Sequence, residues 1–326
     1  MMNWQSNLNW QLAKQRAEYI QQIRNFFFER NIVEVETPLL SNGTITDIHL
    51  EAFKCQYLYL NDSGGNASTE LYLQTSPEFA MKRLLASGYG SIFQLCKAFR
   101  HEEHGRFHNP EFSILEWYRV GFDQNQLMAE VDSLLQTILA CNKATYISYQ
   151  QAFIEHLNID PLTISLAQLK FVMAKQGIIG DWIEAEQDVD ILLQVLFSQC
   201  IEKKIGVNSP CFVYDYPKSQ AALAKGSNSD PRVAERFECY YQGIELANGY
   251  HELTDAIELK QRFEADNRKR VEMKRSVKPI DENFMQAMLS GLPQCSGVAL
   301  GLDRLLMLAL KASDIKSTMA FDITKA

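Results

Sequence analysis

Two stretches of the chain carry side chains that suit the binding of phosphate groups. The first runs from Phe99 to Phe112 and has the pattern of a strand, a loop and a second strand, with Arg100 where the loop begins. The second, residues 297–304, leads through glycines and short apolar residues into Arg304. A planar guanidinium matches phosphate oxygens with paired hydrogen bonds, which an ammonium group does not. The two arginines could therefore hold the phosphates of one nucleotide, and the glycines would let the backbone approach it closely.

A third stretch, residues 243–255, contains two carboxylates that could bind a metal ion. Mg²⁺ prefers carboxylate oxygens and usually takes one or two of them from a protein that binds phosphates. Glu245 and Glu252 are seven positions apart, so a regular strand would place them on opposite faces. A bulge at Asn248-Gly249 would restore a common face. The alternative interpretation is a pair of glutamates on an edge strand that bind no ligand.

The elements that must position these residues are mostly strands in hairpins. Apolar residues at helical spacing predict helices at 9–30, at 256–274 and repeatedly between about 124 and 205. Strands clustered in hairpins, with helices between the clusters, indicate an α+β protein with an antiparallel sheet. We expect the helical stretch 124–205 to lie outside that sheet as an insertion. Alternating apolar and polar residues predict a strand at 32–37. Further strands are expected around Leu71 and Leu73 and at 91–100, 111–120, 211–216 and 236–249, the last with a turn at Gln242-Gly243.

The composition is that of a globular protein in a reducing compartment. Apolar residues make up 46% of the 326 residues and charged residues 22%, and no apolar run is long enough to span a bilayer. The first residues lack a basic segment followed by an apolar core, so we expect no secretory signal. The seven cysteines are scattered without metal-type pairs, which indicates reduced thiols in the cytoplasm. The net charge of −8 disfavours a large nucleic-acid footprint without excluding a local basic patch.

These stretches together resemble the class II aminoacyl-tRNA synthetases, within their lysyl branch. Residues 99–112 resemble motif 2 of that family and 297–304 resemble motif 3, while 26–38 resembles motif 1. Residues 75–78 and 243–255 also match the lysyl pattern, and the five pieces follow in the family's order. The resemblance implies a single catalytic domain, with a mostly antiparallel sheet flanked by helices, that binds ATP and Mg²⁺. It also implies a homodimer, because motif 1 normally builds the subunit interface.

The resemblance implies a role for each residue of the nucleotide site. Arg100 would hold the α-phosphate and Arg304 the γ-phosphate, so that both stabilise negative charge during attack on the α-phosphorus. Adenine would stack on Phe112 and donate a hydrogen bond to Glu102. His101 stands where lysyl-type enzymes commonly carry Asn, and we expect it to face away from Arg100. The complete expected set is Arg100, His101, Glu102, Asn109, Phe112, Glu245, Leu246, Gly301 and Arg304, with Mg²⁺ on Glu245 and Glu252.

A lysine-like substrate has two amines and one carboxylate, so its pocket needs acidic side chains. Glu78 could supply one, although Ser76-Pro77 is expected to begin a helix, and an acid in a first turn is also favoured for structural reasons alone. Tyr118 could lie over an ammonium group or else pack in the core beside Trp117. Ala299 stands where lysyl-tRNA synthetases generally carry Gly, and its methyl group would crowd the backbone end of a substrate. The expected substrate-binding set is Ser76, Pro77, Glu78, Tyr118, Asn248, Glu252 and Ala299.

The expected acceptor of the activated amino acid is a protein, and tRNA is disfavoured. Lysyl- and aspartyl-type synthetases carry an anticodon-binding barrel before motif 1, and we expect none here, since motif 1 begins within the first few tens of residues. Residues 46–50, 108–112 and 243–255 resemble the lysyl-synthetase paralogues that modify bacterial elongation factor P. That resemblance implies activation of (R)-β-lysine and transfer of the β-lysyl group to the ε-amino group of one lysine on the factor, in the cytoplasm.

Three other functions stay open at this point. A truncated synthetase could still charge tRNA, and a free amino-acid ligase could use the same fold. A catalytically inactive paralogue could act as a regulator or a binding partner. Such proteins usually lose a motif arginine or a metal carboxylate, whereas this chain keeps Arg100, Arg304, Glu245 and Glu252. Exchange of pyrophosphate into ATP separates an adenylating enzyme from an inactive one.

Overall fold

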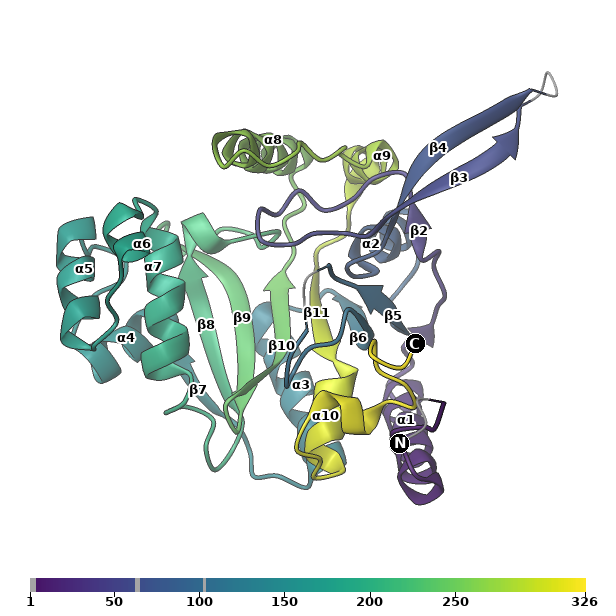
Figure 1. Ribbon diagram of the computed structural model, residues 1–326, viewed down its shortest axis with the longest axis horizontal. Helices are drawn as coiled ribbons and strands as arrows, with labels where there is room; N and C mark the ends of the chain where they lie inside the picture. Colours follow the sequence, from purple (N-terminus) through teal and green to yellow (C-terminus); the bar gives the residue numbers. More distant parts are fainter. Residues whose placement is uncertain (1–3, 62–64, 102–103) are drawn as a thin grey trace. The chain divides into compact units, whose positions relative to one another are not determined.

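The computed structural model describes residues 4–61, 65–101 and 104–326. They form two compact units, whose elements are labelled in Figure 1. Unit 1 combines both ends of the chain, Met1–Gly121 and Leu253–Ala326, and unit 2 is the continuous middle segment Phe122–Glu252. The α+β class expected from the sequence is confirmed, because each unit contains mostly antiparallel strands together with helices.

Four strands of unit 1 pair in the order β1, β5, β6, β11. β1 (Val33–Glu34) runs parallel to β5 (Ile92–Phe99). β5 pairs antiparallel with β6 (Glu111–Val120), which pairs antiparallel with β11 (Cys295–Gly301). The strands predicted at 91–100 and 111–120 are therefore confirmed, and the strand predicted at 32–37 is shorter than expected.

Helix α1 (Trp10–Phe28) packs against β5 and β6 through one apolar face. Asn9 caps it by accepting a hydrogen bond from the Leu12 N–H at 2.9 Å. On its buried face, the ring of Phe27 stacks on Phe93 with 4.4 Å between centroids and meets Trp117 edge-on at 5.2 Å. The other helices described in unit 1 are α2 (Glu78–Ala86), α8 (Ala256–Glu272), α9 (Glu282–Gly291), α10 (Leu302–Ala309) and the 3₁₀ helix η3 (Ile315–Thr318).

A second sheet of unit 1 has three strands in the order β2, β4, β3. β2 (Leu40–Ser41) pairs with the end of β4 (Asn66–Leu73), whereas β3 (Lys54–Leu60) pairs with β4 along its whole length. β3 and β4 therefore form a two-stranded ribbon, which Figure 1 shows running out beyond β2 and α2. The sequence predicted only the end of β4, around Leu71 and Leu73, and β3 was missed.

Four strands of unit 2 pair in the order β10, β9, β8, β7. β8 (Cys211–Pro217), β9 (Val233–Tyr241) and β10 (Ile244–His251) are antiparallel neighbours, and β7 (Thr145–Ser148) runs parallel to β8. The predicted turn at Gln242-Gly243 is confirmed, since it joins β9 to β10 with both residues in the left-handed region, at φ of 52° and 71°.

Most helices of unit 2 fall within the stretch 124–205 that was predicted to be helical, and the role of that stretch as an insertion stays a prediction. Their core combines aliphatic side chains with a group of aromatic rings: the ring of Tyr149 lies 5.6 Å from Phe197 and 4.8 Å from Tyr216, between centroids. The helices are α3 (Gln124–Leu139), α4 (Tyr149–Leu157), α5 (Leu166–Lys175), α6 (Asp181–Ala185), α7 (Val189–Leu196), the π-helix η1 (Phe197–Ile201) and the 3₁₀ helix η2 (Lys218–Gln220).

Candidate functional site

The loop between β5 and β6 begins with Arg100, the first of the two predicted phosphate-binding arginines. Its backbone N–H donates to the Pro110 carbonyl at 2.9 Å, which fixes the start of the loop against its end. Its guanidinium carbon lies 5.1 Å from the centroid of the Phe112 ring. The structure thus brings together Arg100 and Phe112, the side chains predicted to bind the α-phosphate and the adenine of one nucleotide.

The neighbouring residues of this loop make contacts of other kinds. The ring of His101 lies 5.0 Å from the ring of Phe53. The buried Asn109 side chain donates to the Glu111 carbonyl at 2.6 Å and accepts from the Ile323 N–H at 3.0 Å, so both ends of its amide hold backbone groups. These contacts give Asn109 a structural role in the loop, and its predicted role as a nucleotide ligand stays a prediction. Glu102 lies outside the described residues.

Arg304, the second predicted arginine, lies in the first turn of α10, directly after β11 and Gly301. Its Nε donates to the Phe107 carbonyl at 3.2 Å, and its Nη2 lies 2.6 Å from Nε2 of His108. These contacts hold Arg304 against the same loop that begins at Arg100. The two stretches that were read from the sequence as one phosphate site therefore meet in unit 1.

Asp303, next to Arg304, anchors the start of α10. Its carboxylate is 1% exposed, and its Oδ2 accepts from the Ser113 N–H at 2.6 Å. Its Oδ1 lies 3.1 Å from Nη2 of Arg16. One carboxylate thus ties α10 to β6 and to α1, which fixes the position from which Arg304 reaches the loop.

One face of β6 and β11 combines a buried carboxylate with small residues. Glu116 is 2% exposed and accepts a hydrogen bond from the Tyr118 hydroxyl at 2.6 Å. In the ladder, Ala299 stands directly opposite Glu116, and Gly297 stands opposite Tyr118. Opposed side chains have Cβ atoms about 5 Å apart, so the Ala299 methyl group lies beside the Glu116 side chain. This face therefore combines a carboxylate and a hydroxyl group with the small residues of β11.

Glu116 was not among the residues predicted from the sequence. The sequence does contain a signal for it, because Glu116 is the one charged residue within the apolar stretch 114–118. Burying a carboxylate in a strand costs free energy of folding unless a partner or a ligand compensates its charge. Glu116 is therefore a further candidate for binding an ammonium group of a substrate.

Ser76 and Glu78 lie where β4 leads into α2, and both line one cavity of about 80 Å³. Oε1 of Glu78 is 2.6 Å from Nζ of the buried Lys82, so this carboxylate already neutralises a cation of its own helix. That pairing favours the structural interpretation of Glu78 over substrate binding. The sequence predicts Ser76 as the N-cap of α2, but the N-cap is Pro77. Ser76 Oγ instead accepts a hydrogen bond from the Glu78 N–H at 3.4 Å.

The two predicted metal carboxylates belong to unit 2, where β10 contains a bulge. The pairing of β10 with β9 shifts between Glu245 and Ala247, so the extra residue is Leu246. The bulge predicted at Asn248-Gly249 was wrong in its position, because both residues pair regularly with β9. Leu246, which was expected at the nucleotide, is buried.

The bulge nevertheless gives β10 the common face that the predicted metal site would need. Glu245 pairs with Tyr240 and Asn248 pairs with Glu238, and Tyr240 and Glu238 are two residues apart on one face of β9. Glu245 and Asn248 therefore share that face. Continued alternation beyond the strand places Glu252 on it as well.

Glu238 is the centre of a buried hydrogen-bonding cluster on this face. It accepts from the Tyr216 hydroxyl at 2.7 Å, from the Tyr240 hydroxyl and from the Arg236 guanidinium, and Asn248 Nδ2 lies 3.5 Å away. Burial, reinforced by the Glu238 charge, raises the pKa of both tyrosines well above the usual value. Burial would lower the pKa of Arg236, but the Glu238 carboxylate outweighs burial and raises it. The cluster thus keeps an ion pair beside Asn248.

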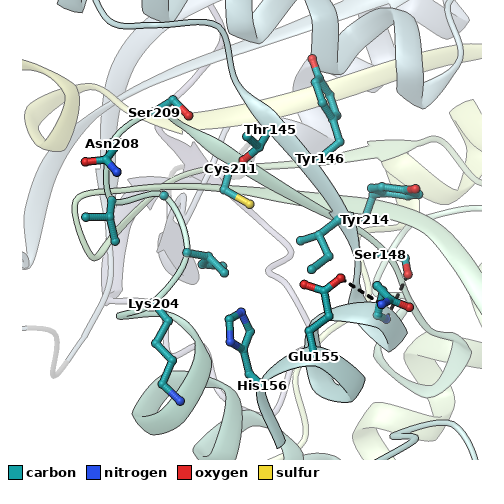
Figure 2. Close-up of a pocket in the computed structure, with 15 residues that line it drawn as sticks. Thr145, Tyr146, Ser148, Glu155, His156, Lys204, Asn208, Ser209, Cys211 and Tyr214 are labelled. Atoms are coloured by element: carbon teal, nitrogen blue, oxygen red, sulfur yellow. Dashed lines mark hydrogen bonds between the residues drawn. The ribbon is translucent and has the colours of Figure 1, made fainter. Parts of the chain in front are cut away.

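A polar cavity of about 650 Å³ lies elsewhere in unit 2, between β7, α4 and the segment that precedes β8 (Figure 2). Glu155, His156 and Lys204 contribute charged or titratable side chains to its lining. Burial raises the pKa of the Cys211 thiol in its wall, which keeps that sulfur protonated at neutral pH. None of the residues predicted to bind ATP or an amino acid lines this cavity.

Within 4–61, 65–101 and 104–326, no three His, Cys, Asp or Glu side chains gather as ligands for a metal ion. In the same part of the chain, no helix combines the length and the apolar character needed to cross a membrane.

Comparison with known proteins places this geometry in a family. The model of the tRNA synthetases class II (D, K and N) matches residues 1–325. The chain is 53% identical over 324 residues to a protein of Sodalis glossinidius (strain morsitans) named elongation factor P--(R)-beta-lysine ligase, covering 99% of this chain and 98% of that protein. Proteins of the same name from Vibrio cholerae serotype O1 and Salmonella typhi are 53% and 51% identical, over 99% of this chain and 99% and 98% of their own lengths. The chain therefore belongs to the class II tRNA synthetases (D, K and N) and, within them, to the family of the elongation factor P--(R)-beta-lysine ligases.

Proposed function

We propose that the chain is an ATP-dependent ligase that activates (R)-β-lysine and transfers the β-lysyl group to the ε-amino group of one lysine on elongation factor P. The observation that carries this proposal is the similarity to ligases of that name, which extends over 99% of this chain and 98% or more of theirs. The two arginines that meet at one loop of unit 1 supply the cations that adenylation needs.

The reaction takes two steps. First, a carboxylate oxygen of β-lysine attacks the α-phosphorus of ATP, and the bond from that phosphorus to its bridging oxygen breaks. Pyrophosphate leaves with the bonding electrons, and β-lysyl adenylate remains. Second, the unprotonated amine of the acceptor lysine attacks the carbonyl carbon, AMP leaves with the electrons of the acyl–oxygen bond, and the nitrogen loses a proton as the amide forms. Both steps gather negative charge on phosphate oxygens.

Arg100 and Arg304 are the residues to which we assign the phosphates. Arg304 is held by the Phe107 carbonyl and by His108, so its guanidinium is in position before ATP binds and little reorganisation is needed. Arg100 lies beside the Phe112 ring, which offers an aromatic face for adenine. Removing either guanidinium would take a fixed charge from the transition state.

Glu116, Tyr118 and Ala299 are the residues of unit 1 to which we assign the amino acid. The Glu116 carboxylate, oriented by the Tyr118 hydroxyl, suits an ammonium group. The Ala299 methyl group stands opposite Glu116 and narrows the space at that point. A β-amino acid has one more carbon between its carboxylate and the nearer amine than an α-amino acid has. A different part of β-lysine than of α-lysine would therefore meet that methyl group. Asn248 and Glu252, which belong to unit 2, stay predicted substrate ligands.

Mg²⁺ is proposed as the metal that accompanies ATP. Glu245 and Glu252 suit it because both are carboxylates and the bulge in β10 gives them a common face. When bound, the ion would neutralise phosphate charge and polarise the α-phosphorus. Because the proposed acceptor is a translation factor, we infer a cytoplasmic location, and we keep the homodimer as a prediction.

The first experiment is exchange of pyrophosphate into ATP by the purified chain, with (R)-β-lysine and with α-lysine. Exchange that favours β-lysine, followed by a gain of one β-lysyl group in the mass of elongation factor P, is the expected result. Exchange with α-lysine alone, together with aminoacylation of tRNA, would instead support a truncated synthetase. No exchange with either isomer would refute adenylation of lysine and favour an inactive paralogue.

A further inference from the structure

The ribbon of β3 and β4 has one face without any charged side chain. Side chains alternate along each strand, so the opposed pairs Tyr57–Thr69 and Tyr59–Ala67 point to the same side. The rings of Tyr57 and Tyr59 stack with 5.6 Å between centroids, yet remain 54% and 41% exposed. We call this side the tyrosine face, and its members are Cys55, Tyr57, Tyr59, Ala67, Thr69 and Leu71.

The opposite face of the ribbon differs because polar groups pair with one another across it. Nζ of Lys54 lies 3.2 Å from Oε1 of Glu70, and Gln56 donates to Ser68 at 3.4 Å. Two leucines, Leu58 and Leu60, share that face with these polar pairs and are 71% and 70% exposed. The tyrosine face instead exposes stacked aromatic area on a ribbon of two strands, an arrangement that is barely stable unless something covers it.

The outer edge of β3 adds backbone groups to this surface. β3 is the last strand in the order β2, β4, β3, so the N–H and C=O groups along its outer side are not part of the described ladders. Proteins usually protect such an edge with charges, Pro or a bulge. β3 has a charge only at Lys54, contains no Pro and pairs with β4 in continuous register. The edge can therefore accept a strand from another protein.

The ribbon is rooted beside the proposed catalytic residues of unit 1. β4 ends at Leu73, and the chain reaches Ser76 three residues later. At the other root, the Phe53 ring packs against His101, the residue after Arg100, and the His101 N–H donates to the Glu51 carbonyl at 2.8 Å. A protein held by the ribbon would therefore lie near the site that must receive its lysine.

We propose that the tyrosine face and the edge of β3 are the docking surface for the acceptor protein. The inference rests on the proposed function, because it takes the acceptor to be a protein. A face without cations, on a chain of net charge −8, does not suit the phosphate backbone of tRNA. Exposed tyrosines are among the side chains that carry most of the binding energy in protein–protein interfaces. The partner that fits is an uncharged, strand-bearing surface near the acceptor lysine.

The test separates the two half-reactions in a matched pair of variants. Tyr57→Ser with Tyr59→Ser removes the two rings of the tyrosine face, and Leu58→Ser with Leu60→Ser changes two more exposed apolar residues of the same strand on the other face. We expect the tyrosine variant to raise the KM for elongation factor P by about 30-fold or more in β-lysyl transfer, the loss typical of interface hot spots. Its pyrophosphate exchange with (R)-β-lysine should stay within about twofold of wild type, and the leucine variant should change neither reaction by more than that.

Four results would overturn the docking surface. The first is a normal KM for elongation factor P in the tyrosine variant, and the second is an equal rise of that KM in the leucine variant. The third is a parallel loss of pyrophosphate exchange in the tyrosine variant. The fourth is a changed oligomeric state of the tyrosine variant in sedimentation, together with a normal KM for elongation factor P. The last would mean that a second copy of the chain covers the face. If the wild-type chain performs neither half-reaction, the proposed function fails, and direct binding of elongation factor P to the two variants then decides the docking surface by itself.

Discussion

Replacing Asp303 with Ala should loosen the start of α10 and release Arg304 from its fixed position. The carboxylate accepts from the buried Ser113 N–H at 2.6 Å and lies 3.1 Å from Nη2 of Arg16. Arg16 keeps a second partner after the change, because its Nε donates to the Thr318 carbonyl at 3.0 Å. The main loss therefore falls on Ser113, whose N–H would have no acceptor in a dry environment.

The size of the effect follows from these two contacts of Asp303 and from its charge in the first turn of α10. Leaving the Ser113 N–H unsatisfied lowers the free energy of unfolding by about 1–3 kcal/mol. Arg16 is 23% exposed and can be rehydrated, so losing the ion pair contributes about 1 kcal/mol at most. Removing a negative charge from the first turn of α10 adds about 0.3–1 kcal/mol. We expect Asp303→Ala to lose about 1–5 kcal/mol in all, and Asp303→Asn to lose less because its amide oxygen can still accept from Ser113.

Urea unfolding followed by tryptophan fluorescence is the appropriate measurement, since Trp117 lies on β6 close to this contact. Asp230→Ala is the matched control, because that carboxylate pairs with Arg232 on the surface of unit 2 and its removal should hardly move the midpoint. A wild-type midpoint for Asp303→Ala, or an equal loss in Asp303→Asn, would refute the assigned contacts. A normal rate of pyrophosphate exchange by a folded Asp303→Ala protein would refute its role in positioning Arg304.

Three further predictions address the chemistry and the pH dependence. Arg304→Ala should lower pyrophosphate exchange by about 10²–10³-fold without shifting the urea midpoint, and near-normal exchange would contradict the phosphate role. Ala299→Gly should raise exchange with α-lysine relative to β-lysine, because it removes the crowding methyl group, and an unchanged ratio would count against it. Burial would raise the pKa of Glu51, but hydrogen bonds from Lys278 and Arg270 outweigh it and hold the pKa below 4.5. Glu51 therefore stabilises the fold above about pH 4.5, and this stabilisation is lost as the pH falls through its folded pKa. The free energy of unfolding of Glu51→Gln should accordingly depend less on pH on the acid side than that of wild type. Identical pH profiles of the two proteins would rule this out.

The strands and turns that depend on local sequence could be predicted. β5 and β6 are rich in apolar residues and lie on either side of a polar loop, and Gln242-Gly243 has the residue types that a two-residue hairpin turn requires. β3 could not be recognised from alternation, because Tyr57, Leu58 and Tyr59 follow one another without it. A ribbon with both faces exposed leaves no periodic pattern in its sequence.

The position of the bulge in β10 could not be predicted because it depends on a partner strand. Gly249 drew the prediction to Asn248-Gly249, since a glycine in a strand often marks a bulge. The structure gives this glycine another reason: a Cβ atom at position 249 would lie 2.3 Å from Cζ of Phe237 on β9. The extra residue at Leu246 is set by the register with β9, which no local pattern encodes.

The candidate site was predicted only in part, because some of its contacts also depend on partners distant in sequence. Arg100 and Arg304 could be found because each lies in a stretch of characteristic residue types. The Glu78–Lys82 ion pair and the Tyr118–Glu116 hydrogen bond could not, because they depend on which neighbours a folded backbone brings close. The sequence thus predicted which groups could act, and the structure supplied the partners that favour or oppose each role.

Because unit 1 combines both ends of the chain, two of its paired strands are synthesised at widely separated times. β6 pairs with β11 from Val120 opposite Cys295 to Ile114 opposite Gly301, and all of unit 2 is synthesised between the two strands. At bacterial elongation rates, β6 would wait roughly 10–35 s for its partner. During that time the edge of β6 is open to wrong pairing, whereas unit 2 completes its own sequence before β11 is synthesised. We expect nascent chains that stop before Cys295 to need a chaperone, and Arg304, the last of the proposed catalytic residues to emerge, to take its place only when that edge is closed.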